Sequence, residues 1–177
     1  MNKQHILGFF DDLVRTPVFL FLCAMFLCGA AAGGLTGLRA GEGDGAAVLS
    51  SLLAELPAHV VQSTLCALIW VLLPLVCAFL RPRELLLSAV AAARGFVLAM
   101  TVAVSVGEGN ALIIGAAGVP AVLSVSALLA ACSMVWQGGE ATGRYSLRTC
   151  RMPYFLCITL VVLSARLRAA IAALCNV

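Results

Sequence analysis

Long apolar runs separated by short polar segments dominate the hydrophobic pattern of this chain. Five of these runs reach about the 20 residues that a helix needs to cross about 30 Å of hydrocarbon. The pattern therefore predicts an all-α integral membrane protein, built as a bundle of five transmembrane helices. We expect crossings near residues 16–38, 59–80, 85–106, 111–136 and 153–175, the last of them interrupted by Arg166 and Arg168.

Two further segments have apolar residues at helical spacing on one side only. They are residues 1–15 and residues 46–56, and Pro57 ends the second one. This pattern is typical of a helix that lies in the membrane interface, although a partner-binding helix would have the same pattern. We therefore expect an interfacial amphipathic helix at 1–15, then a single transmembrane domain at 16–177 with an outer amphipathic helix near 46–56.

Composition excludes a water-soluble domain. The chain has 177 residues, of which 63% are hydrophobic and only 11% charged, so too little polar surface is present to cover the apolar residues. Acidic residues precede the first apolar run, which argues against a cleaved secretory signal. The net charge of +3 comes without a basic cluster, so we expect no nucleic-acid binding. The eight cysteines stand singly, a spacing that favours neither a zinc site nor a disulfide framework.

The distribution of basic residues predicts the orientation. Short cytoplasmic connections carry an excess of Lys and Arg. If the N-terminus is cytoplasmic, only Arg39 among the basic residues of the connections lies outside. The inner segments then carry seven basic residues: Lys3, Arg15, Arg81, Arg83, Arg144, Arg148 and Arg151. We therefore expect the N-terminus inside and the C-terminus outside.

Two predicted crossings carry a small residue at every fourth position, which places these residues on one face of a helix. In a bilayer such faces allow two helices to approach closely. We expect the two stripes to pack against each other, or against another chain in a homo-oligomer. The stripes are Gly29, Gly33 and Gly37 in the first crossing, and Ala91, Gly95, Ala99 and Ala103 in the third.

Three predicted crossings carry their most unusual residue at a similar depth. At about 1.5 Å per residue, Arg94 lies about 15 Å from the inner end of its crossing and Arg166 about 18 Å, and Pro120 lies about 15 Å from the outer end. A charged residue at the centre of a membrane helix costs about 2.5–3.5 kcal/mol and normally faces the protein interior or a water-filled cavity. The sequence therefore predicts a polar centre formed by Arg94, Pro120 and Arg166.

Two roles are open for this polar centre. Pro120 removes a backbone donor and frees the carbonyl of Ala116, so Arg94 would pin the third helix to a broken middle of the fourth. Alternatively, Arg94 and Arg166 together would attract an anion. The hydroxyl groups at similar depth suit either role: Thr101, Ser105, Ser124 and Ser126.

Catalytic motifs are missing from the sequence. It contains no phosphate-binding glycine loop, no His-Glu-x-x-His motif and no paired carboxylates on one helix face. The two histidines stand at the ends of predicted segments. We therefore expect a protein that is not an enzyme and that needs no cofactor and no metal.

Three runs resemble a known family. They are L-I-W-V-L-L-P-L (68–75), A-A-A-R-G-F-V-L-A-M-T-V (91–102) and G-N-A-L-I-I-G-A-A-G-V-P-A-V-L-S-V (109–125). In their order and spacing they resemble stage II sporulation protein M, a small multi-spanning membrane protein. That family usually has Leu-Pro-Gln-Asn where this chain has Val-Pro-Ala-Val (119–122), so the resemblance is to a divergent member.

This resemblance implies a non-enzymatic scaffold of the bacterial cytoplasmic membrane. Such a scaffold localises membrane-anchored peptidoglycan hydrolases that remodel the cell wall during engulfment in sporulation. The rival hypothesis is a small transporter or permease subunit built around Arg94, Pro120 and Arg166. A third hypothesis assigns the two amphipathic segments the task of shaping the lipid interface.

Overall fold

The computed structural model describes residues 14–39, 60–107, 111–138 and 151–174. Its secondary structure is helical. No strand occurs in these ranges. The predicted all-helical fold is thus confirmed, with all five predicted apolar runs forming helices. They are α2 (Pro17–Arg39), α4 (Val60–Cys77), α5 (Arg83–Gly107), α6 (Ala111–Gly138) and α7 (Arg151–Leu174). The predicted amphipathic segments 1–15 and 46–56 lie outside the described residues, except for positions 14 and 15.

Three of the helices contain a stretch long and apolar enough to cross a membrane. These stretches are Pro17–Arg39, Arg83–Ala103 and Pro120–Gly138. The described parts of α4 and α7 contain shorter apolar stretches, Ala67–Cys77 and Met152–Leu167. Crossings by α2, α5 and α6 therefore agree with the sequence-based expectation, and crossings by α4 and α7 remain predictions.

A tight turn joins α4 to α5 and ends α4 earlier than the hydrophobic pattern predicts. The amides of Phe79 and Leu80 donate to the carbonyls of Val76 and Cys77, at 3.1 and 3.2 Å, which tightens the last turn. Pro82 follows and has no amide proton to continue a helix. As a result α4 ends at Cys77 although the apolar run continues to Leu80.

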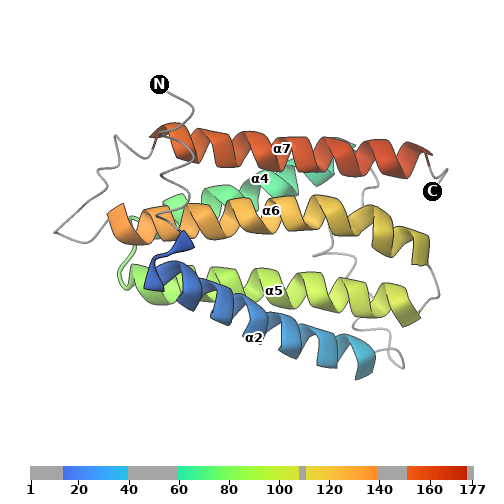
Figure 1. Ribbon diagram of the computed structural model, residues 1–177, viewed down its shortest axis with the longest axis horizontal. Coiled ribbons are helices and arrows are strands. Elements are labelled where there is room, and N and C mark those ends of the chain that lie inside the picture. Colours follow the sequence, from blue (N-terminus) through green and yellow to red (C-terminus); the bar gives the residue numbers. More distant parts are fainter. Residues whose placement is uncertain (1–13, 40–59, 108–110, 139–150, 175–177) are drawn as a thin grey trace.

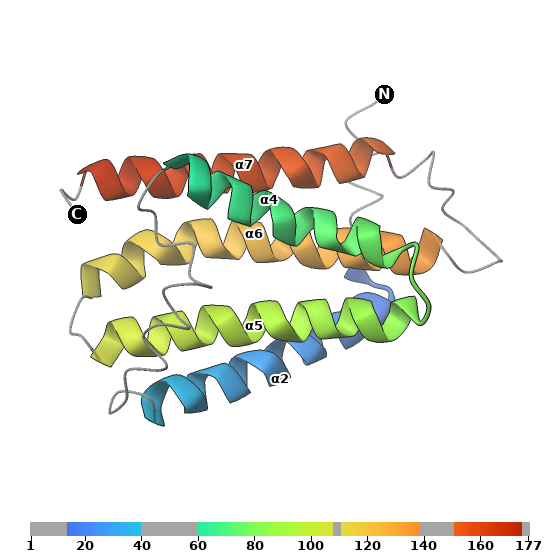
Figure 2. The same ribbon diagram turned by 180° about the vertical axis from the view of Figure 1, so that it is seen from behind.

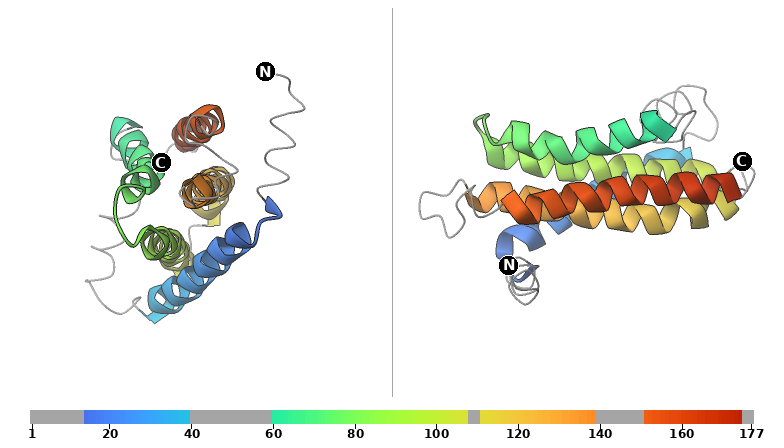
Figure 3. Two further views of the ribbon diagram at one scale, coloured as in Figure 1. Left: turned by 90° about the vertical axis from the view of Figure 1, so that its left-hand side faces the viewer. Right: turned by 90° about the horizontal axis from the view of Figure 1, so that it is seen from above.

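The helices form an elongated bundle in which α2, α5 and α7 run in one direction and α4 and α6 in the other (Figures 1 and 2). The starts of α2, α5 and α7 consequently lie at the same end of the molecule as the ends of α4 and α6. Viewed along its axis, the bundle has α2 beside α5 at one edge and α4 and α7 at the opposite edge (Figure 3).

Helix α6 is the central element of the packing. Every residue from 127 to 135 is buried, as expected for a helix that is apolar on all sides and surrounded by other helices. One of its faces packs against α4 and α7 in a cluster that includes Val71, Met134 and Val161. Another face packs against α2, α5 and the end of α4 in a cluster that includes Leu22 and Leu87.

Polar and aromatic contacts join the helices at specific points. The amide Nε2 of Gln137, at the end of α6, donates to Thr16 Oγ1 just before α2, at 3.0 Å. Nearby, the rings of Phe21 and Trp136 meet edge to face, with their centroids 5.9 Å apart. These contacts fix the start of α2 against the end of α6.

A further contact joins α7 to α4 beside a proline. The hydroxyl of Tyr154 donates to the backbone carbonyl of Val71 at 2.5 Å. Val71 lies one turn before Pro74, which is inside α4 and supplies no amide donor. Side chains of neighbouring helices commonly satisfy carbonyls near such prolines in membrane helices.

The glycine stripe of α2 packs directly on α5. A Cβ atom added at Gly29 or Gly33 would collide with the backbone of Ala92 or Phe96, and one added at Gly37 would lie 2.7 Å from Ala103 Cβ. The two backbones are therefore as close as only glycine permits, which is the packing that small-residue stripes produce in a bilayer.

On the α5 side the contact includes Gly95 and Ala103 of the predicted stripe together with the neighbouring row of residues. The α2 glycines face the backbone of Ala92, Phe96 and Met100. Gly95 lies at the interface, where a side chain would meet Phe26 of α2, whereas Ala91 is buried in the cluster formed with α6. Two helices in close contact interlock their ridges and grooves, so the glycines of one fit between the ridges of the other.

We predict that Gly33→Ala destabilises the protein because the added methyl group collides with the backbone of Phe96. Overpacking of this kind costs about 1–3 kcal/mol. The free energy of unfolding in lipid bicelles measures the effect.

Gly34→Ala is the matched control, since a Cβ atom at Gly34 meets nothing within 4 Å. This neighbouring substitution should leave stability unchanged or raise it slightly, because alanine has the higher helix propensity. Equal stability of the two variants would contradict the close packing of α2 on α5.

Candidate functional site

Arg94 is buried in the middle of the bundle. Only 2% of its surface is exposed, and it is among the largest fully buried side chains in the described part of the chain. It belongs to the buried face of α5, where Leu87, Ala91 and Arg94 follow one another at helical spacing. The arginine thus replaces an apolar residue at a core position.

The guanidinium of Arg94 contacts the two neighbouring helices α4 and α6. Its Nη2 donates to Ser124 Oγ on α6, at 3.4 Å, and its Cζ lies 5.1 Å from the ring centroid of Trp70 on α4. The Ser124 hydroxyl donates its own proton to the carbonyl of Ala121 at 2.9 Å. Its lone pairs therefore remain available to accept from the arginine.

These two neutral partners lower the free-energy cost of a charge in the core. A cation over a tryptophan face is stabilised by about 2 kcal/mol or more when both groups are desolvated. Hydrogen bonds to charged groups contribute about 1.5–3 kcal/mol at good geometry, and the long Arg94–Ser124 distance places this one at the weak end. Arg94 consequently connects α5 to α4 and α6 through neutral groups.

Pro120 shares this region, but α6 is not broken there. The helix continues through the proline from Ala111 to Gly138. The sequence-based prediction that the middle of this helix is broken is therefore wrong. Pro120 is fully buried and lies one turn before Ser124, so the two residues are on the same side of α6. Arg94 contacts the Ser124 hydroxyl on α6, and its contact with the carbonyl of Ala116 stays a prediction.

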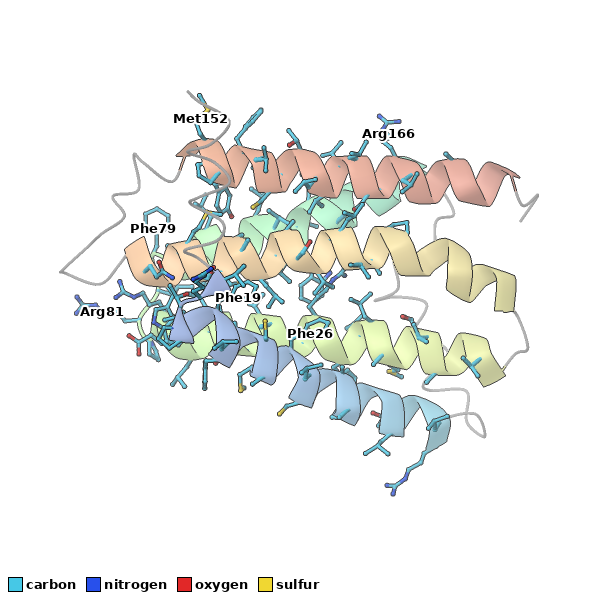
Figure 4. The ribbon with its side chains drawn as sticks, viewed as in Figure 1. Phe19, Phe26, Phe79, Arg81, Met152 and Arg166 are labelled. Carbon is cyan, nitrogen blue, oxygen red and sulfur yellow. The ribbon has the colours of Figure 1, made fainter. Side chains whose placement is uncertain are left out.

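Arg166 does not join Arg94. It is exposed and points away from the bundle on the outer side of α7 (Figure 4). The buried residues of α7 include Val161, Ser164 and Ala165, and Arg166 is turned about 100° from Ala165 because a helix has about 3.6 residues per turn. The expectation of two arginines in one polar centre is thus overturned by the rotation of α7.

Trp70 is the residue of this site that the sequence analysis missed. It is half-buried and comes one turn before Pro74 in α4. The signal in the sequence was its position: a tryptophan inside an apolar helix, away from the interfacial ends where this residue is normally enriched. An aromatic face is one of the few groups at such a depth that can stabilise a cation.

The chemistry available to Arg94 is limited. Arginine keeps its proton in proteins, so Arg94 cannot act as a proton donor or acceptor in a transfer step. Among the described residues, no group of three or more His, Cys, Asp or Glu side chains is arranged to bind a metal ion. What the arrangement can do is hold three helices in a fixed relation.

Comparison with known proteins returned no relative: no family model, no curated protein and no solved structure matches this chain.

We predict an energetic coupling between Arg94 and Trp70. Trp70→Leu should lower the free energy of unfolding by about 2 kcal/mol more in the wild-type protein than in the Arg94→Leu background, because only the wild type loses the cation–π contact. A double-mutant cycle in lipid bicelles measures this difference.

Trp136, the second tryptophan of the chain, provides the control. It lies near the end of α6, about 18 Å along the helix from Ser124, so its effect should be additive with Arg94→Leu to within about 0.5 kcal/mol. Equal coupling of Arg94 to both tryptophans would contradict a specific contact with Trp70.

Proposed function

We propose that this protein is a non-enzymatic scaffold of the bacterial cytoplasmic membrane. It holds membrane-anchored cell-wall hydrolases at the sites where the peptidoglycan is remodelled. The observation that carries the scaffold role is the way Arg94 is held: a buried cation that contacts Trp70 and Ser124 braces three helices against one another. The identity of the partners rests on the resemblance to stage II sporulation protein M.

The brace supports a static role over a transport role. The rival transporter hypothesis places a substrate site near the midplane, at the predicted polar centre of Arg94, Pro120 and Arg166. Arg166, the second cation of the predicted centre, lies on the outside of α7. Without it, Arg94 is the centre of the site and contacts both Trp70 and Ser124, which favours a fixed core.

The surfaces of the bundle support contacts within the membrane. Large apolar side chains are exposed along α2 and α7, such as Leu27, Leu35, Phe155 and Leu163. In a bilayer these faces contact lipid or the transmembrane anchors of other proteins. Membrane anchors associate through close packing, so an apolar outer face is suited to holding them.

The orientation is part of the proposal. Arg15, Arg81 and Arg83 lie at the end of the bundle where α2 and α5 begin, and we call this the basic end. Arg39 ends α2 at the opposite end. Since cytoplasmic connections carry more basic residues, the basic end faces the cytoplasm and α7 ends outside.

We predict that alkaline phosphatase fused after Val177 is active, because the C-terminus is extracytoplasmic, whereas green fluorescent protein fused there is dark. A fusion within the α4–α5 turn, after Arg81, should behave in the opposite way. Phosphatase activity at the turn and fluorescence at the C-terminus would reverse the proposed orientation.

We predict that affinity purification from native membranes in mild detergent recovers peptidoglycan hydrolases with the wild-type protein as bait. Arg94→Leu should recover the same hydrolases per folded bait, because in this proposal Arg94 braces the fold and does not contact the partner. Mass spectrometry of the eluates gives the comparison.

Gly34→Ala is the control bait, since Gly34 is at an uncrowded position of α2. Recovery of an ATPase or of a solute-binding protein in place of hydrolases would contradict the scaffold proposal and favour a permease subunit. Unchanged localisation of the recovered hydrolases in cells that lack this protein would also contradict it.

A further inference from the structure

Arg166 is a cation on the lipid-facing side of a helix. It is exposed, and it forms no hydrogen bond or ion pair with any residue that the structure describes. The large side chains exposed on the same helix are apolar: Met152 and Phe155 at 64% each, and Leu163 at 59%. Arg166 is therefore a cation on an otherwise apolar outer face of α7.

Helix geometry gives the depth of Arg166. From Met152 to Arg166 the helix rises by about 21 Å, at about 1.5 Å per residue. If the apolar stretch begins at the inner boundary of a hydrocarbon layer about 30 Å thick, the Cα atom of Arg166 lies about 9 Å below the outer boundary. A long arginine side chain can extend toward that boundary while its methylene groups remain in the apolar layer.

We propose that Arg166 binds the phosphate group of an outer-leaflet phospholipid. A guanidinium presents two parallel N–H donors that fit two phosphate oxygens. The phosphate lies just beyond the hydrocarbon boundary, in the direction in which the side chain must extend. The binding site thus consists of the Arg166 guanidinium together with the apolar side chains of Leu163 and Leu167, which contact the acyl chain.

The exposed position of Arg166 favours a lipid phosphate over a group inside the bundle. Its side chain lies on the outer side of α7 (Figure 4), where it can extend along the helix toward the headgroup layer while its methylene groups stay in the apolar layer.

The length of α7 agrees with this contact. Its apolar stretch Met152–Leu167 is followed by further helix to Leu174, and the whole helix of 24 residues spans about 36 Å. Arg166 therefore lies within the helix, and its side chain must extend to reach the phosphate level. This site requires only that α7 spans a membrane, and it is independent of any scaffold function.

The test is native mass spectrometry of the purified full-length protein in detergent, titrated with phosphatidylglycerol. We expect Arg166→Leu to bind one phospholipid fewer than the wild type at equal lipid concentration, with at least a tenfold higher Kd at the lost site. Arg166→Lys should retain the lipid because it keeps the charge, and Arg166→Gln should lose it.

Three comparisons make the result specific. Diacylglycerol with the same acyl chains lacks the phosphate, so its binding should not depend on residue 166. Thr159→Leu changes an exposed residue of the same helix without changing charge, and it should bind lipid as the wild type does. Inorganic phosphate should not displace the phospholipid, because it cannot occupy the apolar part of the site.

Equal phospholipid binding by wild type and Arg166→Leu would overturn the proposal. So would displacement of the lipid by inorganic phosphate, which would identify a simple anion site. Loss of a co-purifying membrane protein from Arg166→Leu with lipid binding unchanged would assign Arg166 to a partner's carboxylate. Equal thermal stability of the four variants establishes that each is folded. Since no partner protein is present in the lipid measurement, its outcome is separate from that of the scaffold experiment.

Discussion

The charge of Arg94 is the constraint on which the arrangement of the bundle depends. A cation in an apolar interior costs about 2.5–3.5 kcal/mol unless groups around it compensate. Trp70 on α4 and Ser124 on α6 provide that compensation, so α4 and α6 must both lie against the same level of α5. Apolar contacts alone would allow helices to slide or rotate at small cost. The requirement to surround one guanidinium selects a particular register for three of them.

Helix α2 is added to this arrangement by a different kind of contact. Lipid chains are as apolar as leucine. Burial of apolar surface of α2 against the bundle therefore gains little free energy relative to contact with lipid. The glycines at 29, 33 and 37 bring its backbone against α5, where dispersion contacts between the two chains compensate for the loss of lipid contacts. Gln137 then fixes the start of α2 through Thr16. The packing of α4, α5 and α6 thus depends on a buried charge, whereas the packing of α2 on α5 depends on glycines that allow the two backbones to approach closely.

Features that depend on local sequence pattern could be predicted from the sequence. Features that depend on how each helix is rotated about its axis could not. The helix positions follow from runs of apolar residues, and the approach of α2 to α5 follows from glycines spaced by four. The two arginines have similar depths along their helices, but depth does not determine which side of a helix faces inward. Arg94 shares a face with Leu87 and Ala91, whereas Arg166 is one residue past the buried Ala165 and so faces outward. Trp70 was missed for the same reason, since its partner is on another helix and no local spacing links them.

The different surroundings of the two arginines bear on function. A membrane protein that moves a solute must let its polar groups exchange partners during the cycle, so those groups cannot be held by fixed neighbours in each state. Arg94 is enclosed by side chains from two other helices and carries a proton that it does not release. Its contacts stabilise a single arrangement of the core. The side chains left for contacts outside the bundle are those on its outer faces, namely Arg166, for which we propose a phospholipid, and the exposed apolar side chains of α2 and α7. A scaffold requires a core that keeps one arrangement and outer faces that can contact other membrane components.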